Sequence, residues 1–327
     1  MNSLSQDMTD NGILLLHIER WRLTVLAVLL QSFQFLLVIL VAYLFKQAKI
    51  LRSTDGVALQ KIILNLTLPA TIVVGFNGVS VEPILFIMIS LGLLTNIALV
   101  TLGGFLWRNK EAPLQSLMMF SQAGYNIGNF TIPFVQGFFP AAIPYIGSFD
   151  MGNALMLFGG SPMIVDKMTG QNHSNDGYIR RILRLFRSPS FTTYIVMFLL
   201  ALIGIVLTEE MLSVFRLFSS GNAFLSMFMV GLYLEIRIDS VSFKRVRQLL
   251  ATRYIIGSLV AAIFFLVLPL PELVRISLVL VALAPIGTVS TINMIIYGNK
   301  RSLASFLSSV SIIISLIMMT GALLLIM

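Results

Sequence analysis

Long apolar runs without a charged residue constrain this chain more than any other feature. Residues 23–45, 83–107, 192–207 and 303–327 contain no Asp, Glu, Lys or Arg, and most of these runs reach the roughly 20 residues that cross a hydrocarbon core as a helix. The whole chain is 57% hydrophobic and 11% charged, whereas a soluble domain carries about 25% charged residues. The sequence therefore predicts an all-α polytopic membrane protein.

Hydropathy, charges and Gly/Pro positions divide the chain into ten predicted transmembrane helices. These spans are 22–45, 57–76, 83–107, 114–136, 141–165, 189–207, 212–234, 249–269, 273–297 and 302–326. Residues 1–21 are polar and mixed in charge, unlike a signal peptide, and we expect them to form an N-terminal tail. The chain has no cysteine, which excludes disulfides and thiolate chemistry.

The positive charges predict the orientation of the spans. All but four of the 22 lysines and arginines fall on loops of one parity, which the positive-inside rule places in the cytoplasm. The four exceptions are Arg20, Arg22, Arg216 and Arg275. We therefore predict a multi-pass protein of the cell (plasma) membrane with both termini extracytoplasmic. Because the net charge of +8 is explained by topology, no nucleic-acid partner is expected.

A hydrophilic cytoplasmic loop at residues 166–188 separates two sets of five spans, at 22–165 and 189–327. An odd number of spans inverts the second set, and inverted repeats are typical of secondary transporters. Pro133 in span four and Pro285 in span nine occupy corresponding places. We expect two inverted five-helix repeats, with an ordinary ten-helix bundle as the alternative.

Span four concentrates polar, Gly and Pro residues between positions 121 and 133. Pro133 removes a backbone donor and glycine disfavours helix, so we expect the helix to be interrupted and to line a cavity. Three side-chain amides would line it, those of Gln122, Asn126 and Asn129. The alternative is a helix-packing motif formed by Gly124 and Gly128.

Span nine repeats this pattern after Pro285, with polar side chains at Thr288, Ser290 and Asn293. If the two broken helices cross, their N-terminal ends would meet and could bind a carboxylate. No Lys or Arg is predicted deep within a span. Asn65, which lies close to Pro69 in span two, is expected near the same cavity, although a proline kink with an incidental amide explains it equally well.

Asp150 is the one acidic residue predicted well inside a span. A carboxylate there costs about 2.5–3.5 kcal/mol on insertion scales, so a proton, a partner or water should compensate. We predict that Asp150 couples transport to protons. The alternative is a structural role in which the carboxyl bonds an amide such as that of Asn153. No His or Cys lies in a span, which leaves no expected metal site, cofactor or enzymatic centre.

The motifs together resemble the auxin efflux carrier family of permeases, whose prokaryotic members include malate permeases. The resemblance rests on residues 65–70, 126–129 with Pro133, 149–153, 229–232, and the region from Pro285 to Asn299. It implies two inverted repeats with crossed helices in spans four and nine. It also implies a scaffold of spans 1, 2, 6 and 7 that forms a homodimer, and a moving transport domain of spans 3–5 and 8–10.

The leading functional hypothesis is a secondary transporter of small organic anions such as carboxylates, driven by membrane potential or a proton gradient. A sodium-coupled organic anion symporter is the nearest alternative, with Asp150, Thr288 and Ser290 as oxygen ligands. A membrane-embedded enzyme and a non-transporting sensor are alternatives of other classes. The sequence has no Walker-type loop, so ATP is not an expected energy source.

Overall fold

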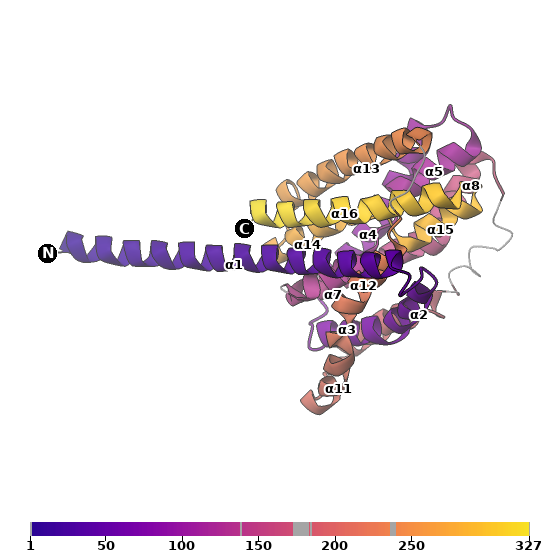
Figure 1. Ribbon diagram of the computed structural model, residues 1–327. Coiled ribbons are helices and arrows are strands. Elements are labelled where there is room, and N and C mark those ends of the chain that lie inside the picture. Colours follow the sequence, from indigo (N-terminus) through magenta and orange to yellow (C-terminus); the bar gives the residue numbers. More distant parts are fainter. Residues whose placement is uncertain (1, 138, 173–182, 184, 236–239, 327) are drawn as a thin grey trace.

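The computed structural model describes residues 2–137, 139–172, 183, 185–235 and 240–326. Within these ranges the chain is helical and contains no β-strand, only one isolated antiparallel bridge. Much of the predicted cytoplasmic loop, residues 173–182 and 184, lies outside the described residues, as does Met1 of the predicted tail. Helix α1 (Asn2–Gln47) extends at its N-terminal end far beyond the other helices in Figure 1.

Six helices in the described ranges are long and apolar enough to cross a membrane. They are Val25–Gln47, Asp55–Phe76, Pro83–Leu106, Glu209–Tyr233, Phe243–Leu266 and Arg301–Ile326. Their outward faces carry large exposed apolar residues such as Leu29, Phe86 and Leu259, which suits a surface covered by lipid. The protein is therefore an all-helical multi-pass membrane protein.

Most of these helices are continuous, and two combine shorter segments. The elements concerned are α1 (Asn2–Gln47), α2 (Asp55–Ile62), η1 (Ile63–Thr67), α3 (Leu68–Phe76), α4 (Pro83–Leu106), α11 (Glu209–Ser220), α12 (Asn222–Tyr233), α13 (Ser240–Leu266) and α16 (Arg301–Ile326). Helix α1 begins at Asn2, well before the predicted span start at residue 22, so the predicted N-terminal tail continues the first span as a helix.

The other four predicted spans are built from shorter pieces. They comprise α5 (Ala112–Gln122), η2 (Ile127–Thr131), α6 (Ile132–Gln136), η3 (Pro140–Ala142), α7 (Ile143–Leu155), η4 (Met156–Gly160), α8 (Ser161–Thr169), α10 (Pro189–Leu202), α14 (Glu272–Ala282) and α15 (Thr288–Ile296). No single segment among these has the length of a span, although α7, η4 and α8 follow one another without a break. None of them is among the six apolar membrane-crossing helices, so the count of ten spans stays a prediction.

Three prolines explain where the helices change their winding. Pro69, Pro133 and Pro162 each stand two residues after a π-helical segment, η1, η2 and η4 respectively. Proline has no N–H and its ring clashes with the carbonyl four residues earlier, and a wider π turn accommodates that carbonyl. Each π segment leaves backbone carbonyls available to other partners.

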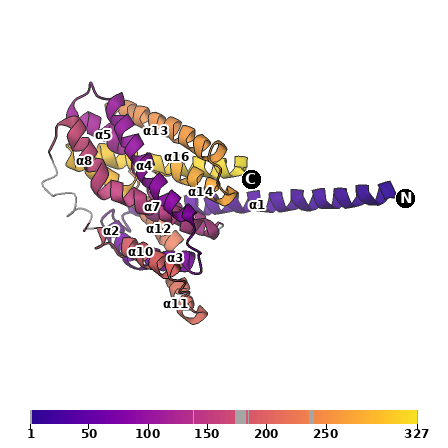
Figure 2. The same cartoon turned by 180° about the vertical axis from the view of Figure 1, so that it is seen from behind.

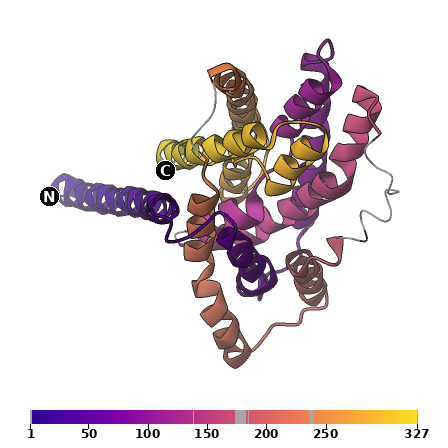
Figure 3. The same ribbon diagram turned by 45° about the vertical axis from the view of Figure 1, so that its right-hand side comes forward.

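The helices pack as two sets that contact each other along one side. In the first set α1 packs on α12, and α3 packs on α10 and α11. In the second, α4 packs on α5 and α7, α13 on α14, and α15 on α16. Figure 2 shows α10 beside α3 from behind, and Figure 3 separates the first set, with α11 at its lower end, from the second.

Candidate functional site

Two helix interruptions meet inside the second set. Helix α5 ends at Gln122 before η2 begins at Ile127, and α14 ends at Ala282 before α15 begins at Thr288. The connecting residues pair as an antiparallel bridge: the Asn126 N–H donates to the Pro285 carbonyl at 2.9 Å, and the Gly287 N–H donates to the Gly124 carbonyl at 3.1 Å. We call this pairing of residues 123–126 with 283–287 the crossing.

Gly124 makes the first interruption possible. Its φ of +84° lies in the left-handed region, which costs an L-residue with a side chain about 1–2 kcal/mol. Because α5 has already ended at Gln122, Gly124 and Gly128 do not form a packing motif on one continuous helix. The glycine instead lets the chain turn out of the helix toward Pro285.

Buried side chains satisfy the backbone groups that the interruptions expose. Asn96 on α4 accepts from the Gly124 N–H at 2.6 Å, and Ser311 on α16 accepts from the Ile286 N–H at 3.2 Å. Asn153 on α7 accepts from the Tyr125 N–H and donates to the Tyr125 carbonyl, each at 3.1 Å. Hydrocarbon offers no partners for such groups, so these residues make the crossing possible.

Arg253 lies deep in the bundle, and the prediction that no Lys or Arg does so was wrong. It stands in the middle of α13 and is only 4% exposed. Because Arg253 lies close to the start of the predicted span 249–269, the positive-inside pattern assigns it to a cytoplasmic loop. The helix begins earlier, at Ser240, and so carries this arginine inward to the crossing.

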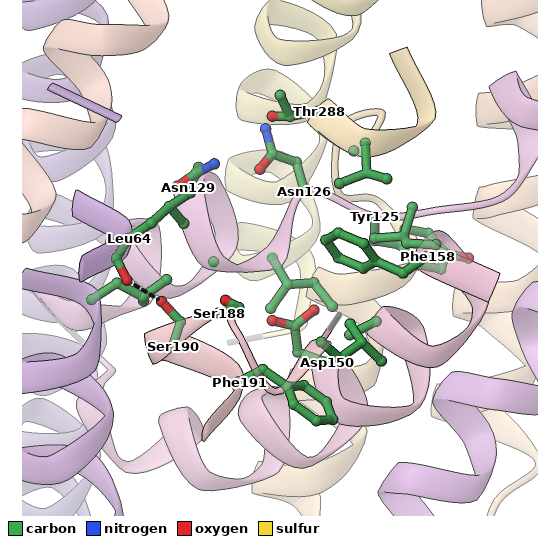
Figure 4. Close-up of a pocket in the computed structure, with 18 of the residues that line it drawn as sticks. Leu64, Tyr125, Asn126, Asn129, Asp150, Phe158, Ser188, Ser190, Phe191 and Thr288 are labelled. Carbon is green, nitrogen blue, oxygen red and sulfur yellow. Dashed lines mark hydrogen bonds between the residues drawn. The ribbon is translucent and has the colours of Figure 1, made fainter. Parts of the chain in front are cut away.

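A cavity of about 160 Å³ lies beside the crossing. Figure 4 shows Asn126 and Thr288 on one side of it, Asp150 and Phe191 on another, and Asn129 near Leu64. The cavity is also lined by Gln60, Leu68, Tyr125, Ile127, Gly128, Ala154, Leu157, Phe158, Leu185, Ser188, Ser190, Tyr194, Gly287, Val289 and Ile292. Residues from both helix sets therefore line the cavity.

Two helix N-termini face this cavity. Ile127 and Gly128 open η2, Thr288 and Val289 open α15, and all four line the cavity. The first N–H groups of a helix have no intrahelical acceptor and carry the positive end of the helix dipole. Such an arrangement can bind an anion without a lysine or arginine.

The π-helical segments surround the same cavity, since Leu64, Asn129 and Leu157 belong to η1, η2 and η4. Side chains use some of the carbonyls that these segments release. Ser190 donates to the Leu64 carbonyl at 2.8 Å, and Asn293 donates to the Leu157 carbonyl at 3.3 Å. The prolines that follow these segments thus shape the cavity wall without lining the cavity themselves.

Two of the predicted amides, that of Asn126 directly before η2 and that of Asn129 within it, retain hydrogen-bonding capacity. Asn126 and Asn129 are 8% and 7% exposed. Within the described part of the chain, the Asn129 Oδ1 has no hydrogen-bond partner, and the Asn126 side chain makes no hydrogen bond. Buried polar groups are normally paired, so these amides are available to a bound molecule.

Asp150 lines the cavity from α7 and is held by two neighbours. One carboxyl oxygen accepts from the Asn153 amide at 2.9 Å, and the other accepts from the Tyr194 hydroxyl at 3.3 Å. Asn153 is the amide considered for the structural alternative, and it also bonds Tyr125 in the crossing. Asp150 thus faces the cavity and contacts, through Asn153, the backbone of the interruption.

The other predicted site residues do not line the cavity. Ser290 donates to the Ala123 carbonyl at 3.1 Å and ties α15 to the crossing, and the Pro285 carbonyl is part of the bridge. Gln122 donates to the Leu249 carbonyl at 3.4 Å on α13. Pro133 is buried within α6, Asn293 bonds Leu157 as described, and Asn65 is exposed and bonds the Lys61 carbonyl.

Three important residues were missed or only partly foreseen: Asn96, Arg253 and the role of Asn153. Asn96 is completely buried and is the one amide in a helix without charged residues, and an amide in such a place is itself the signal that could have identified it. Among the described residues, no group of three or more His, Asp or Glu side chains could hold a metal ion.

Comparison with protein-family models gave no match for this chain, and comparison with curated proteins gave none either. The resemblance to auxin efflux carriers therefore rests on the residue motifs alone.

Proposed function

We propose that this protein is a secondary active transporter of small organic anions, such as carboxylates, in the cell membrane. The observation that carries the proposal is the crossing: two interrupted helices from distant parts of the chain meet and direct their N-terminal ends to one cavity. Interrupted helices that meet inside a bundle are the usual substrate sites of secondary transporters.

The chemistry of the cavity favours an anion. Its walls supply helix N-termini, the amides of Asn126 and Asn129, and the Thr288 hydroxyl, while Asp150 is the only charged residue that lines it in the described part of the chain. An anion and an ionised Asp150 would repel each other in so small a space. We therefore propose that Asp150 takes up a proton when the anion binds, which couples transport to the proton gradient.

The cavity is small, and two partly exposed residues, Gln60 and Ser188, are among those that line it. A volume of about 160 Å³ corresponds to roughly five liquid-water volumes of about 30 Å³ each, which suits a carboxylate of a few carbons. Gln60 and Ser188, which line it, adjoin loops that the positive charges assign to the cytoplasm. We propose that this conformation is open to the cytoplasm.

The packing of the helices suggests which helices move during transport. We propose that α1, α3, α10, α11 and α12 form a scaffold and a homodimer contact, and that the elements around the crossing form a transport domain. The cavity lies between the two sets, since Leu68 on α3 and Ser190 on α10 come from the first and Asp150 and Thr288 from the second. Movement of one set against the other would expose it to the opposite side.

The test is flux in vesicles reconstituted with the full-length protein. Uptake of labelled mono- and dicarboxylates is measured under an imposed pH gradient, an imposed potential, and neither. We expect saturable uptake of at least one acid that depends on a gradient. Absence of both flux and binding across the panel would refute the transporter proposal and leave a sensor or membrane enzyme to be tested.

A further inference from the structure

Arg253 is a charged residue buried within a candidate membrane-spanning helix. It lies midway along α13, inside the candidate membrane span Phe243–Leu266, and it is 4% exposed. A charged side chain at the centre of a membrane helix is costly unless it is paired. Among the described residues no carboxylate lies within ion-pair distance of this guanidinium, so its partners must be of another kind.

Those partners are four backbone carbonyls, two in the crossing and two directly before it. Nη1 donates to Ser121 at 2.6 Å and to Gln122 at 3.2 Å, and Nη2 donates to Gly124 at 3.4 Å and to Ala284 at 2.9 Å. Ser121 and Gln122 are the last two residues of α5, Gly124 follows the end of that helix, and Ala284 follows the end of α14. One guanidinium therefore caps two helix C-termini at once.

These carbonyls have the character of a cation site. The last carbonyls of a helix lack intrahelical donors and carry the negative end of its dipole. In secondary transporters, half-helix C-termini and unwound carbonyls often coordinate the coupling Na⁺. Here the guanidinium already occupies that set of oxygens, and its carbon also lies 5.4 Å from the centre of the Tyr125 ring, within cation–π range.

We infer that Arg253 is a built-in cation that joins the carbonyl ends of the two interrupted helices, so that the crossing needs no bound Na⁺. The part of this inference that concerns transport rests on the proposed function, whereas the part that concerns the crossing does not. Arg253 is a positioning residue, since it does not line the cavity. Its planar fork reaches both helices, which the single ammonium of a lysine cannot do in the same plane.

Thermal unfolding of the purified full-length protein tests the role at the crossing. We expect Arg253→Ala to lower the apparent melting temperature by roughly 5 °C or more, because four carbonyls lose a charged donor. Arg275→Ala is the matched control: Arg275 donates to one carbonyl, that of Phe265, at 3.0 Å and lies over the Phe265 ring, away from the crossing. Arg275→Ala should lower the apparent melting temperature clearly less than Arg253→Ala does.

Chemical rescue distinguishes a missing cation from a general packing defect. Guanidinium ion at a non-denaturing concentration should raise the melting temperature of Arg253→Ala but not that of wild type or Arg275→Ala. Na⁺, compared with choline at equal ionic strength, should also stabilise Arg253→Ala and leave wild type unchanged. A wild type that Na⁺ stabilises, or an Arg253→Ala variant as stable as Arg275→Ala, would overturn the inference.

If Arg253→Ala does not accumulate, Arg253→Lys decides the question, since it keeps the charge but loses the fork. We expect a lower melting temperature than wild type, and equal stability would contradict the two-helix bridge. Uptake of an organic acid into vesicles is an independent test. Wild-type uptake should be unchanged when choline replaces Na⁺, and loss of uptake in choline would overturn the inference that the crossing needs no Na⁺. A wild type without any flux, combined with the expected thermal shifts, would refute only the transporter proposal.

Discussion

Replacement of Asn153 by alanine should destabilise the protein strongly, because this side chain holds the first interruption together. Asn153 is completely buried. It donates to Tyr125 and Asp150 and accepts from Tyr125 and Asn96, at 2.9–3.3 Å. The variant removes all of these hydrogen bonds and leaves the Tyr125 N–H and carbonyl without their partners.

The magnitude follows from these contacts. Side-chain hydrogen bonds within membrane proteins average about 0.6 kcal/mol, so the loss of four gives about 2.4 kcal/mol. A buried polar group left unsatisfied costs about 1–3 kcal/mol, and two such groups at Tyr125 give about 2–6 kcal/mol. We therefore expect Asn153→Ala to lower the free energy of unfolding by about 2–6 kcal/mol.

The assay is reversible unfolding in mixed micelles titrated with SDS and followed by circular dichroism. Asn293→Ala is the matched control, because Asn293 is half-buried and makes one long hydrogen bond, 3.3 Å to the Leu157 carbonyl. That variant should lose at most about 1 kcal/mol. If Asn153→Ala lowers the free energy of unfolding no more than Asn293→Ala does, the idea that buried amides stabilise the helix interruption is refuted.

Three further predictions concern the cavity and the crossing. Asp150→Asn should abolish the pH dependence of flux in vesicles, because an amide cannot exchange a proton; an unaltered pH profile would remove Asp150 from the coupling. Gly124→Ala should lower the unfolding free energy by more than the about 1–2 kcal/mol of left-handed strain, because a Cβ there would meet Leu157 and Ser290. Gly204 has a similar φ, +72°, with open space around it, so Gly204→Ala should lower the unfolding free energy by the backbone strain alone. Equal decreases in unfolding free energy for the two variants in an SDS titration would contradict the predicted steric clash at Gly124. Asn126→Ala should raise the apparent KM for an organic acid with little effect on stability, whereas Asn65→Ala at an exposed position should not change it.

The membrane architecture was largely predictable, because hydropathy and helix length are local properties of the sequence. The apolar runs 83–107 and 303–327 correspond to α4 and α16. The interruptions also lie where Gly, Pro and amide residues are concentrated, since these residues disfavour helix wherever they occur. The segmented helices around Pro285 are harder to count as spans, because no single piece has the full length.

The partners of the interruptions were not predictable, because they depend on which helices become neighbours. Asn96 and Ser311 belong to apolar helices distant in sequence from the backbone groups they bind. Arg253 was misplaced because a helix can extend beyond its apolar stretch, which shifts a boundary residue inward. Asn65 shows the opposite error: a motif beside a proline was assigned to the cavity, but the helix turns its amide outward.

The bridge at the crossing gives this helical protein one feature of a β-sheet, a register. Helices can slide or rotate against each other in small increments, but the paired hydrogen bonds of Asn126 with Pro285 and of Gly287 with Gly124 allow only one alignment. A shift by one residue would turn alternate side chains to the opposite face, moving Asn126 away from its present position. Insertions and deletions should therefore be excluded from residues 123–126 and 283–287 during evolution, while substitutions that preserve chain length can still change the side chains around the cavity.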